Sequence, residues 1–320
     1  MTKREYVKFA IQHKETDRVP YLIDFCPDAW EAMKNALGEI PSSLYDNYVY
    51  GVSIPWWNWH QLESDWYGKE TPKSKAKVIG TGNYDGLADS IKSAADRTGK
   101  YMLVIIYGSH FEKAYFSRGI ENFLADMAGD PSFAKSLLTK IIDKNMVMLE
   151  NVLTIPEIDG VLLGSDWGSQ RGLLMSPAVW EDMIAPGEQR EYDLIHSYGK
   201  DVWVHSCGCI DVIIPRLVEM GLDVLNPIQP ECMDIEDLKK RYGDKLAFWG
   251  GISTQDTLPY GTPEEVKKEA RRVRDMMSKN GGYILAPSQS LQGDVPVENI
   301  LALLEVANEP IIQEQSECVL

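Results

Sequence analysis

The feature of this 320-residue sequence that most restricts its fold is an alternation of short apolar runs with longer amphipathic segments. Such alternation is typical of β/α units built around a parallel sheet. Strands are predicted at seven apolar runs, namely residues 19–25, 101–107, 160–164, 201–205, 223–226, 246–250 and 283–286. With an eighth strand expected within residues 45–85, the pattern predicts a (β/α)₈ barrel of the TIM type.

Three helices are predicted, two between these strands at residues 132–153 and 262–278 and one after the last strand at residues 296–308. The second begins with Thr262, a capping residue, followed by a first-turn proline and two early carboxylates that suit the helix dipole. The chain shows no internal repeat or linker, and its length suits a barrel, which typically needs about 250 residues or more. We therefore expect one barrel domain over residues 1–320.

Charge and cysteine content restrict the partners and the location. The net charge of −16 argues against nucleic acid, because a polyanion would be repelled over most of the surface. The apolar runs are far shorter than the roughly 20 residues of a membrane helix, and no signal core is visible, so a cytoplasmic protein without membrane contact is expected. Five cysteines, an odd number, indicate reduced thiols that are buried or bind metal.

In a TIM-type barrel, the chemistry belongs at the C-terminal ends of the strands. The carboxylate of Asp166 follows one predicted strand and is our expected catalytic group, unless it only forms a turn with its own backbone. Four more side chains that follow strands are expected to bind substrate, and each could instead bridge loops or fill the core: Gln170, Gln229, Trp249 and Gln289.

His205 and Cys207 form the sharpest chemical signal, in the run Val204-His-Ser-Cys-Gly-Cys209. On an extended segment, side chains two positions apart point the same way, so imidazole and thiolate can reach one ion. Zinc favours this donor set and needs one or two further ligands. The alternative is a polar turn beside a buried thiol. Cys209 could replace Cys207, or be a small buried side chain.

Several stretches resemble the uroporphyrinogen decarboxylase superfamily, in the order that the family has them. They are residues 202–230, Ser165-Asp-Trp-Gly-Ser-Gln170, Phe248-Trp-Gly-Gly-Ile252 and residues 284–299. Together they lie within about residues 159–308, half of the chain. The resemblance implies the same barrel fold.

Within the superfamily, the His-x-Cys pair is similar to that of the zinc-dependent, corrinoid-linked methyltransferases, so His205 and Cys207 match the first two family zinc ligands. Those enzymes add a distant cysteine, whereas residues 287–290 hold none here. Gln289 would be a weak ligand, so we predict Glu231, an ordinary zinc donor, as the third. Cys232 points to the opposite side if the segment stays extended.

The decarboxylases themselves carry an arginine-rich stretch that grips the tetrapyrrole, but residues 18–27 hold one arginine. The resemblance therefore implies a zinc-assisted methyltransferase that moves a methyl group between a small substrate or acceptor and a corrinoid. The chain has no Asp-x-His-x-x-Gly corrinoid segment, so a partner corrinoid protein would carry that cofactor. The alternatives are a metal-free decarboxylase or lyase, with Asp166 or Asp24 stabilising a protonated intermediate, and a non-catalytic corrinoid-binding protein.

Overall fold

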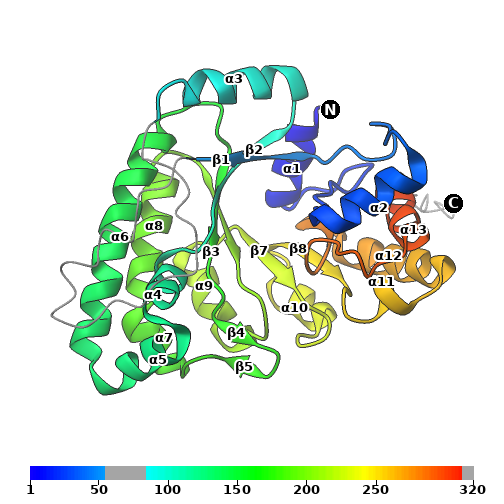
Figure 1. Cartoon of the computed structure of the whole chain (residues 1–320). Helices are drawn as coiled ribbons and strands as arrows, with labels where there is room; N and C mark the ends of the chain where they lie inside the picture. Colours follow the sequence, from blue (N-terminus) through cyan, green and yellow to red (C-terminus); the bar gives the residue numbers. More distant parts are fainter. Residues whose placement is uncertain (55–83, 312–320) are drawn as a thin grey trace, which may run out of the picture. The chain divides into compact units, whose positions relative to one another are not determined.

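The computed structural model describes residues 1–54 and 84–311 (Figure 1). The chain divides into two compact units, each taken by itself below. We call residues Tyr50–Leu225 the central unit, and residues Met1–Val49 together with Asn226–Leu320 the terminal unit. The strand β7 (Val224–Ile228) is divided between them after Leu225. The expectation of a single domain over residues 1–320 stays a prediction.

The central unit is a parallel α/β sheet covered by helices. Its strands β1, β2, β3 and β6 are hydrogen-bonded in that order. β2 pairs with β3 from Leu103 opposite Gly160, and β3 pairs with β6 from Gly160 opposite Asp201. The elements are β1 (Val49–Ser53), α3 (Leu87–Thr98), β2 (Tyr101–Ile106), α4 (His110–Arg118), α5 (Ile120–Gly129), α6 (Pro131–Leu153), β3 (Gly160–Gly164), β4 (Gly168–Ser169), β5 (Gly172–Leu173), α7 (Pro177–Met183), α8 (Ala185–Ser197), β6 (Asp201–His205), η2 (Asp211–Ile213) and α9 (Ile214–Met220).

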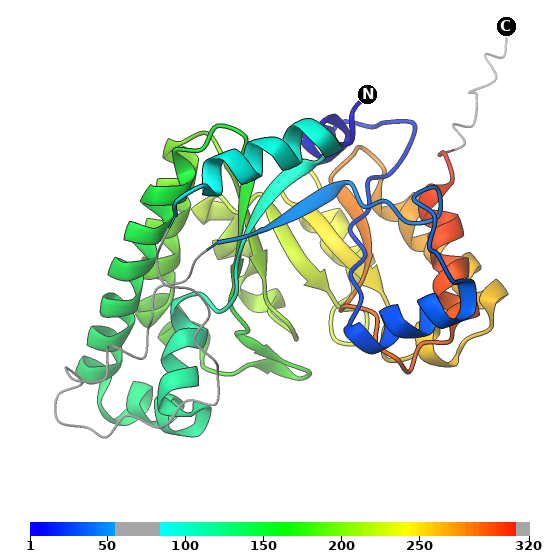
Figure 2. The ribbon, with the colours of Figure 1, turned by 45° about the horizontal axis from the view of Figure 1, so that its top comes forward.

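The long helix α6 begins where the sequence predicts. Pro131 occupies the first turn, and the side chain of Asp130 accepts a hydrogen bond from the backbone N–H of Phe133. Its apolar face is buried, and α6 runs beside α8 in both views of the ribbon (Figures 1 and 2). α8 is therefore held from one side by α6, which matters below because two of its buried residues are glutamates.

The terminal unit pairs β8 with β9 in parallel, from Phe248 opposite Tyr283 to Ile252 opposite Pro287. Thr262 caps α12 through a capping box with Glu265, as its sequence predicts. The elements of this unit, in chain order, are α1 (Lys3–Ile11), α2 (Pro27–Leu37), α10 (Ile235–Tyr242), β8 (Ala247–Ile252), α11 (Thr257–Tyr260), α12 (Pro263–Met277), β9 (Tyr283–Pro287) and α13 (Val297–Asn308).

The prediction of a strand at residues 19–25 is wrong. Residues 19–25 form two isolated parallel bridges and not a continuous strand: Tyr21 pairs with Leu285 in β9, and Phe25 pairs with Leu291 after β9. The reason lies in the side chain of Asn47, which accepts the backbone N–H of Ile23 and donates to its carbonyl. Both backbone groups are thereby removed from a continuous ladder.

The other six predicted strands are confirmed with shifts of a few residues, and so are the three predicted helices. β1 lies inside the range expected for the eighth strand; residues 55–83 of that range are outside the described residues. The α/β class with a parallel sheet is confirmed, but the named strands form an open order, not a closed eight-stranded ring. Among the described helices, none is both long and apolar enough to span a bilayer.

Candidate metal centre

Three potential metal ligands converge in the central unit, at the C-terminal ends of β3 and β6. His205 is the last residue of β6, Cys207 follows two positions later, and Asp166 lies in the loop after β3. The Sγ atom of Cys207 lies 3.3 Å from Nε2 of His205, and Oδ1 of Asp166 lies 3.7 Å from the same nitrogen. The His205 and Asp166 side chains are 26% and 37% exposed, so a ligand can approach.

The backbone fixes this arrangement through contacts between the two loops. The N–H of Cys207 donates to Oδ1 of Asp166 at 2.8 Å, and the N–H of Trp167 donates to Oγ of the buried Ser206 at 3.0 Å. Asp166 therefore bonds across to the neighbouring loop, and the turn-forming alternative raised by its sequence does not describe this contact.

Two glycines allow the loops to approach this closely. A Cβ atom on Gly168 would lie 2.5 Å from the Cys207 carbonyl oxygen. Gly208 has φ +82° and a Cβ there would lie 2.6 Å from the backbone of Ser169. Larger residues would force the loops apart, so the glycine in the His-x-Cys-Gly run allows Cys207 to lie beside Asp166.

The distances from His205 to the other two donors fit a tetrahedral zinc ion. With Zn–S near 2.3 Å and Zn–N and Zn–O near 2.0–2.2 Å, tetrahedral edges are roughly 3.5 Å for S to N and about 3.4 Å for N to O. The observed 3.3 Å and 3.7 Å lie close to those values. Three protein ligands would leave a fourth position for substrate or water, as in catalytic zinc sites.

Glu112, which the sequence analysis missed, is a buried acid next to this cluster. It lies on α4 and is 4% exposed, and its Oε1 accepts a 2.8 Å hydrogen bond from the hydroxyl of Tyr115. Burial raises the pKa of Glu112 to about 7, and the neighbouring Asp166 carboxylate adds to the increase. A signal was available, because Glu112 lies in the first turn of α4, the helix that follows β2.

A second group with metal-ligand spacing lies in the same unit but is fully buried. It consists of His110 on α4 and of Glu188 and Glu191 on α8. Nδ1 of His110 lies 3.3 Å from Oε1 of Glu188 and 3.8 Å from Oε2 of Glu191. We call these three residues the buried triad.

Hydrogen bonds account for most polar atoms of the buried triad. Nε2 of His110 lies 3.2 Å from the Ile184 carbonyl, which requires a proton on that nitrogen, and Glu191 accepts from Ser109 and Asn145. Burial lowers the pKa of His110, but Glu188, Glu191 and the Ile184 carbonyl together outweigh it, so the net pKa is raised. Burial raises the pKa of Glu191. The arrangement is that of a buried ion pair.

Gln170, predicted to bind substrate, is exposed in the turn between β4 and β5 of the central unit. Asp166, His205 and Cys207 are brought together within this unit, whereas the other predicted site residues belong to the terminal unit. There the indole N–H of Trp249 donates to the Leu22 carbonyl at 3.0 Å, so this side chain is part of the packed interior.

Glu231, the predicted third zinc ligand, lies between β7 and α10 of the terminal unit. Its Oε1 accepts a 2.5 Å hydrogen bond from Ser253, and its buried Oε2 has no hydrogen-bond partner among the described residues. Gln229 is buried and its carbonyl accepts the N–H groups of Cys232 and Met233. Gln289 is exposed, and its side-chain oxygen accepts the N–H of Ser290 at 3.1 Å.

The family model for uroporphyrinogen decarboxylase (URO-D) matches residues 70–310, which is most of the chain. The chain belongs to the uroporphyrinogen decarboxylase family, a class to which the His-x-Cys stretch already pointed.

Within the family, the chain is similar to a methylcobamide:CoM methyltransferase MtaA from Methanosarcina barkeri, at 28% identity over 42% of this chain and 38% of that protein. It is also similar to a uroporphyrinogen decarboxylase from Pseudoalteromonas atlantica, at 23% over 56% of this chain and 49% of that one. A solved methyltransferase from Methanosarcina mazei has the same fold, with a TM-score of 0.67 at 16% identity over 97% of this chain and 99% of that one. The matches span about half the length of these curated relatives or less. The expected resemblance to the methyltransferase branch is confirmed.

Proposed function

We propose that the chain is a zinc-assisted methyltransferase, which moves a methyl group between a small methylated substrate or acceptor and a corrinoid carried by a partner protein. The convergence of Asp166, His205 and Cys207 within one ligand sphere is the observation that carries the proposal. The similarity to methylcobamide:CoM methyltransferases supports the reaction class and the corrinoid partner.

Zinc in such a site lowers the pKa of a bound nucleophile and polarises a leaving atom. The protein's own contribution is to hold the ligands in place. Oδ1 of Asp166 fixes the Cys207 backbone, and Ser206 ties the same loop to Trp167. These bonds restrict the thiolate and the imidazole to one side of the loop, which reduces the entropy lost when an ion binds.

In this proposal, Glu112 is the proton acceptor. A thiol or hydroxyl acceptor loses its proton before it takes up a methyl group. A carboxyl with a pKa of about 7 is partly ionised at neutral pH and can accept that proton at its Oε2, while Oε1 stays bonded to Tyr115. We propose Glu112 as the general base, and Gln170, Gln229, Trp249 and Gln289 as the substrate-binding residues predicted from the sequence.

The third zinc ligand has two candidates. Asp166 lies within ligand distance of His205 in the central unit, and Glu231 retains a buried carboxylate oxygen in the terminal unit. Asp166→Asn and Glu231→Gln are matched variants, because each removes one charge with little change of shape. The ligand is the residue whose variant weakens zinc binding by at least about tenfold in a competitive chelator titration.

The proposal is tested by combining purified chain, zinc, a free methylated corrinoid and a thiol, and following demethylation of the corrinoid by its visible spectrum. Transfer that requires zinc and is lost in Cys207→Ser supports a methyltransferase. Stoichiometric corrinoid binding without turnover would favour the non-catalytic alternative, and turnover of a carboxylated substrate by zinc-free protein would favour the lyase.

Uroporphyrinogen decarboxylation is not expected. The guanidinium of Arg18, the arginine of residues 18–27, donates to the Asn308 carbonyl at 2.7 Å. This cation is therefore engaged within the fold, and no cluster of arginines accompanies it in that stretch. Turnover of uroporphyrinogen at about 1 per second or faster, a rate typical of enzymes, would contradict the methyltransferase proposal.

A further inference from the structure

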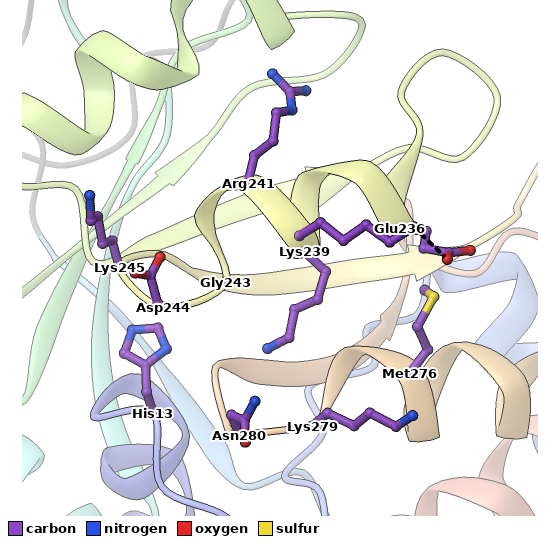
Figure 3. A pocket seen from close by; sticks show the side chains of 11 residues that line it. His13, Glu236, Lys239, Arg241, Gly243, Asp244, Lys245, Met276, Lys279 and Asn280 are labelled. Atoms are coloured by element: carbon purple, nitrogen blue, oxygen red, sulfur yellow. Dashed lines mark ion pairs between the residues drawn. The ribbon is translucent and has the colours of Figure 1, made fainter.

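A basic pocket of about 800 Å³ lies in the terminal unit, and none of the predicted site residues lines it. The C-terminal end of α10, the loop after it, the end of α12 and the residue His13 form its walls (Figure 3). The lining residues are His13, Glu236, Lys239, Lys240, Arg241, Gly243, Asp244, Lys245, Met276, Lys279 and Asn280. We call this the lysine pocket.

The lysine pocket concentrates positive charge on a chain of strongly negative net charge. Its walls carry four lysines and an arginine against two carboxylates, whereas the whole chain has a net charge of −16. Like charges gathered in one hollow repel each other, so such a cluster has a free-energy cost unless an anion offsets it.

Two of the five cations form ion pairs with neighbouring acidic side chains. Lys240 pairs with Glu236 at 2.9 Å and Arg241 pairs with Asp237 at 2.6 Å, both one turn apart on α10. The Arg241 side chain points away from the centre of the pocket in Figure 3. Both are ordinary surface ion pairs, which contribute little to stability on their own.

Lys239 is different because it reaches into the pocket towards His13 and Asn280 (Figure 3). Its Nζ donates to the Gly281 carbonyl at 2.7 Å, and the side chain is partly buried. Burial lowers the pKa of Lys239 to about 8, against the opposing effect of Glu15. Its ammonium has one hydrogen-bond acceptor among the described residues and would gain from a nearby anion.

The remaining cations, Lys245 and Lys279, are exposed and have no ion-pair or hydrogen-bond partner for their ammonium groups among the described residues. Lys279 follows the end of α12, and Lys245 lies two residues before β8. Neither belongs to the last turn of its preceding helix, so stabilisation of a helix dipole does not explain them.

The wall that carries Lys279 is held rigidly. Asn280 and Gly281 have φ of +59° and +72°, and a Cβ on Gly281 would lie 2.5 Å from the backbone of His13. The N–H of Asn280 donates to Glu15 at 2.7 Å. A turn packed this tightly fixes the backbone beside Lys279, which reduces the ordering that is needed when a ligand binds.

We propose that the lysine pocket binds a small ligand that carries two or more linked phosphate groups. Ammonium groups bind phosphate as compact point charges, and those of Lys239, Lys245 and Lys279 come from three segments, which suits several charged groups on one ligand. Met276 and the lysine methylene stems offer an apolar wall beside them. A concave pocket of this size takes a small molecule, not a flat protein surface.

The position of the pocket indicates an effector site and not a second substrate site. Lys245 and Lys279 precede the starts of β8 and β9, whereas Ser253 and Gln289 follow their ends. Chemistry in this class of fold lies at the C-terminal ends of the strands. The inference does not depend on the methyltransferase proposal, because it uses none of the residues of the metal centre.

The test is isothermal titration of the full chain, at about 0.1 M salt without magnesium, with inorganic tripolyphosphate in one arm and ATP in the other. Saturable binding with Kd below about 1 mM is expected in at least one arm. Tighter binding of tripolyphosphate would assign an inorganic ligand, and tighter binding of ATP a nucleotide.

Matched variants make the result specific. The double change K245A/K279A is expected to weaken binding about tenfold or more, while K92A/K268A, which removes two exposed lysines outside the pocket, changes it less than about twofold. Asp244→Asn should tighten binding, because it removes a negative charge from the wall. Absence of saturable binding in both arms, or equal affinity of K245A/K279A and the unchanged chain, would overturn the proposal.

Discussion

The central unit contains two groups of three residues that meet the same distance criterion for a metal site, and they differ in almost everything else. Asp166, His205 and Cys207, which we call the exposed group, are partly exposed, combine sulfur, nitrogen and oxygen donors, and lie at or just after the ends of two strands. The buried triad of His110, Glu188 and Glu191 lies between α4 and α8 and is fully shielded from solvent. Spacing alone therefore does not identify a metal centre.

Hydrogen bonding separates the two groups. In the buried triad, His110 already has an ionic partner in Glu188, and both oxygens of Glu191 accept hydrogen bonds. The ammonium of Lys113, also buried, donates to the Gly108 carbonyl and interacts with Glu191. A divalent ion would have to displace these bonds and tolerate that cation. The exposed group combines a thiol with an imidazole and a carboxylate and is open to solvent, a donor set that suits zinc.

The largest expected effect concerns zinc at the exposed group. The double variant His205→Ala, Cys207→Ser should lose zinc almost completely, because two of its donors are removed. Elemental analysis of protein purified without added metal should give about one zinc per chain for the unchanged protein and close to none for the variant. Stoichiometric zinc in the variant would show that the metal site lies elsewhere, and the distinction drawn between the two groups would then be wrong.

The second expected effect concerns folding and not metal. His110→Ala leaves two buried carboxylates without their imidazole and should lower the free energy of unfolding by about 3–5 kcal/mol. Urea unfolding monitored by circular dichroism measures it. The exposed Asp193→Asn on the same helix, α8, is the control and should change stability little. Zinc content of folded His110→Ala should match that of the unchanged chain; loss of zinc with unchanged stability would identify the buried triad as the metal site.

The same contrast explains what the sequence could predict. His205 and Cys207 are two positions apart on one strand end, so their convergence follows from the period of a strand. Asp166 comes from a different strand, and its position after an apolar run was enough to place it at the same edge, since parallel strands end together.

The buried triad could not be predicted by the same reasoning. Glu188 and Glu191 lie on the buried face of α8 together with Tyr192 and Ile195, a spacing that is normally apolar. Charged residues in that register are a signal of buried ion pairs, but the partner on α4 depends on how two helices pack. The strand prediction for residues 19–25 was wrong for a similar reason. The side chain of Asn47, which is distant in sequence, forms hydrogen bonds with the backbone N–H and carbonyl of Ile23.

The smallest expected effect concerns Glu112, which lies beside the exposed group but is itself buried. Its folded-state pKa of about 7 exceeds the ordinary value of 4.5, so the folded chain holds a proton that the unfolded chain releases. This contribution to stability is fully present below pH 4.5 and is lost as the pH rises to 7. Glu112→Gln should therefore raise the free energy of unfolding of zinc-free protein at pH 8 by roughly 2–3 kcal/mol relative to its effect at pH 4.5. Urea titrations at both pH values measure it, with the exposed Glu121→Gln as control. An equal effect of Glu112→Gln at both pH values would mean that Glu112 is ionised at an ordinary pKa, and the acid beside the metal centre would then have no proton to exchange near neutrality.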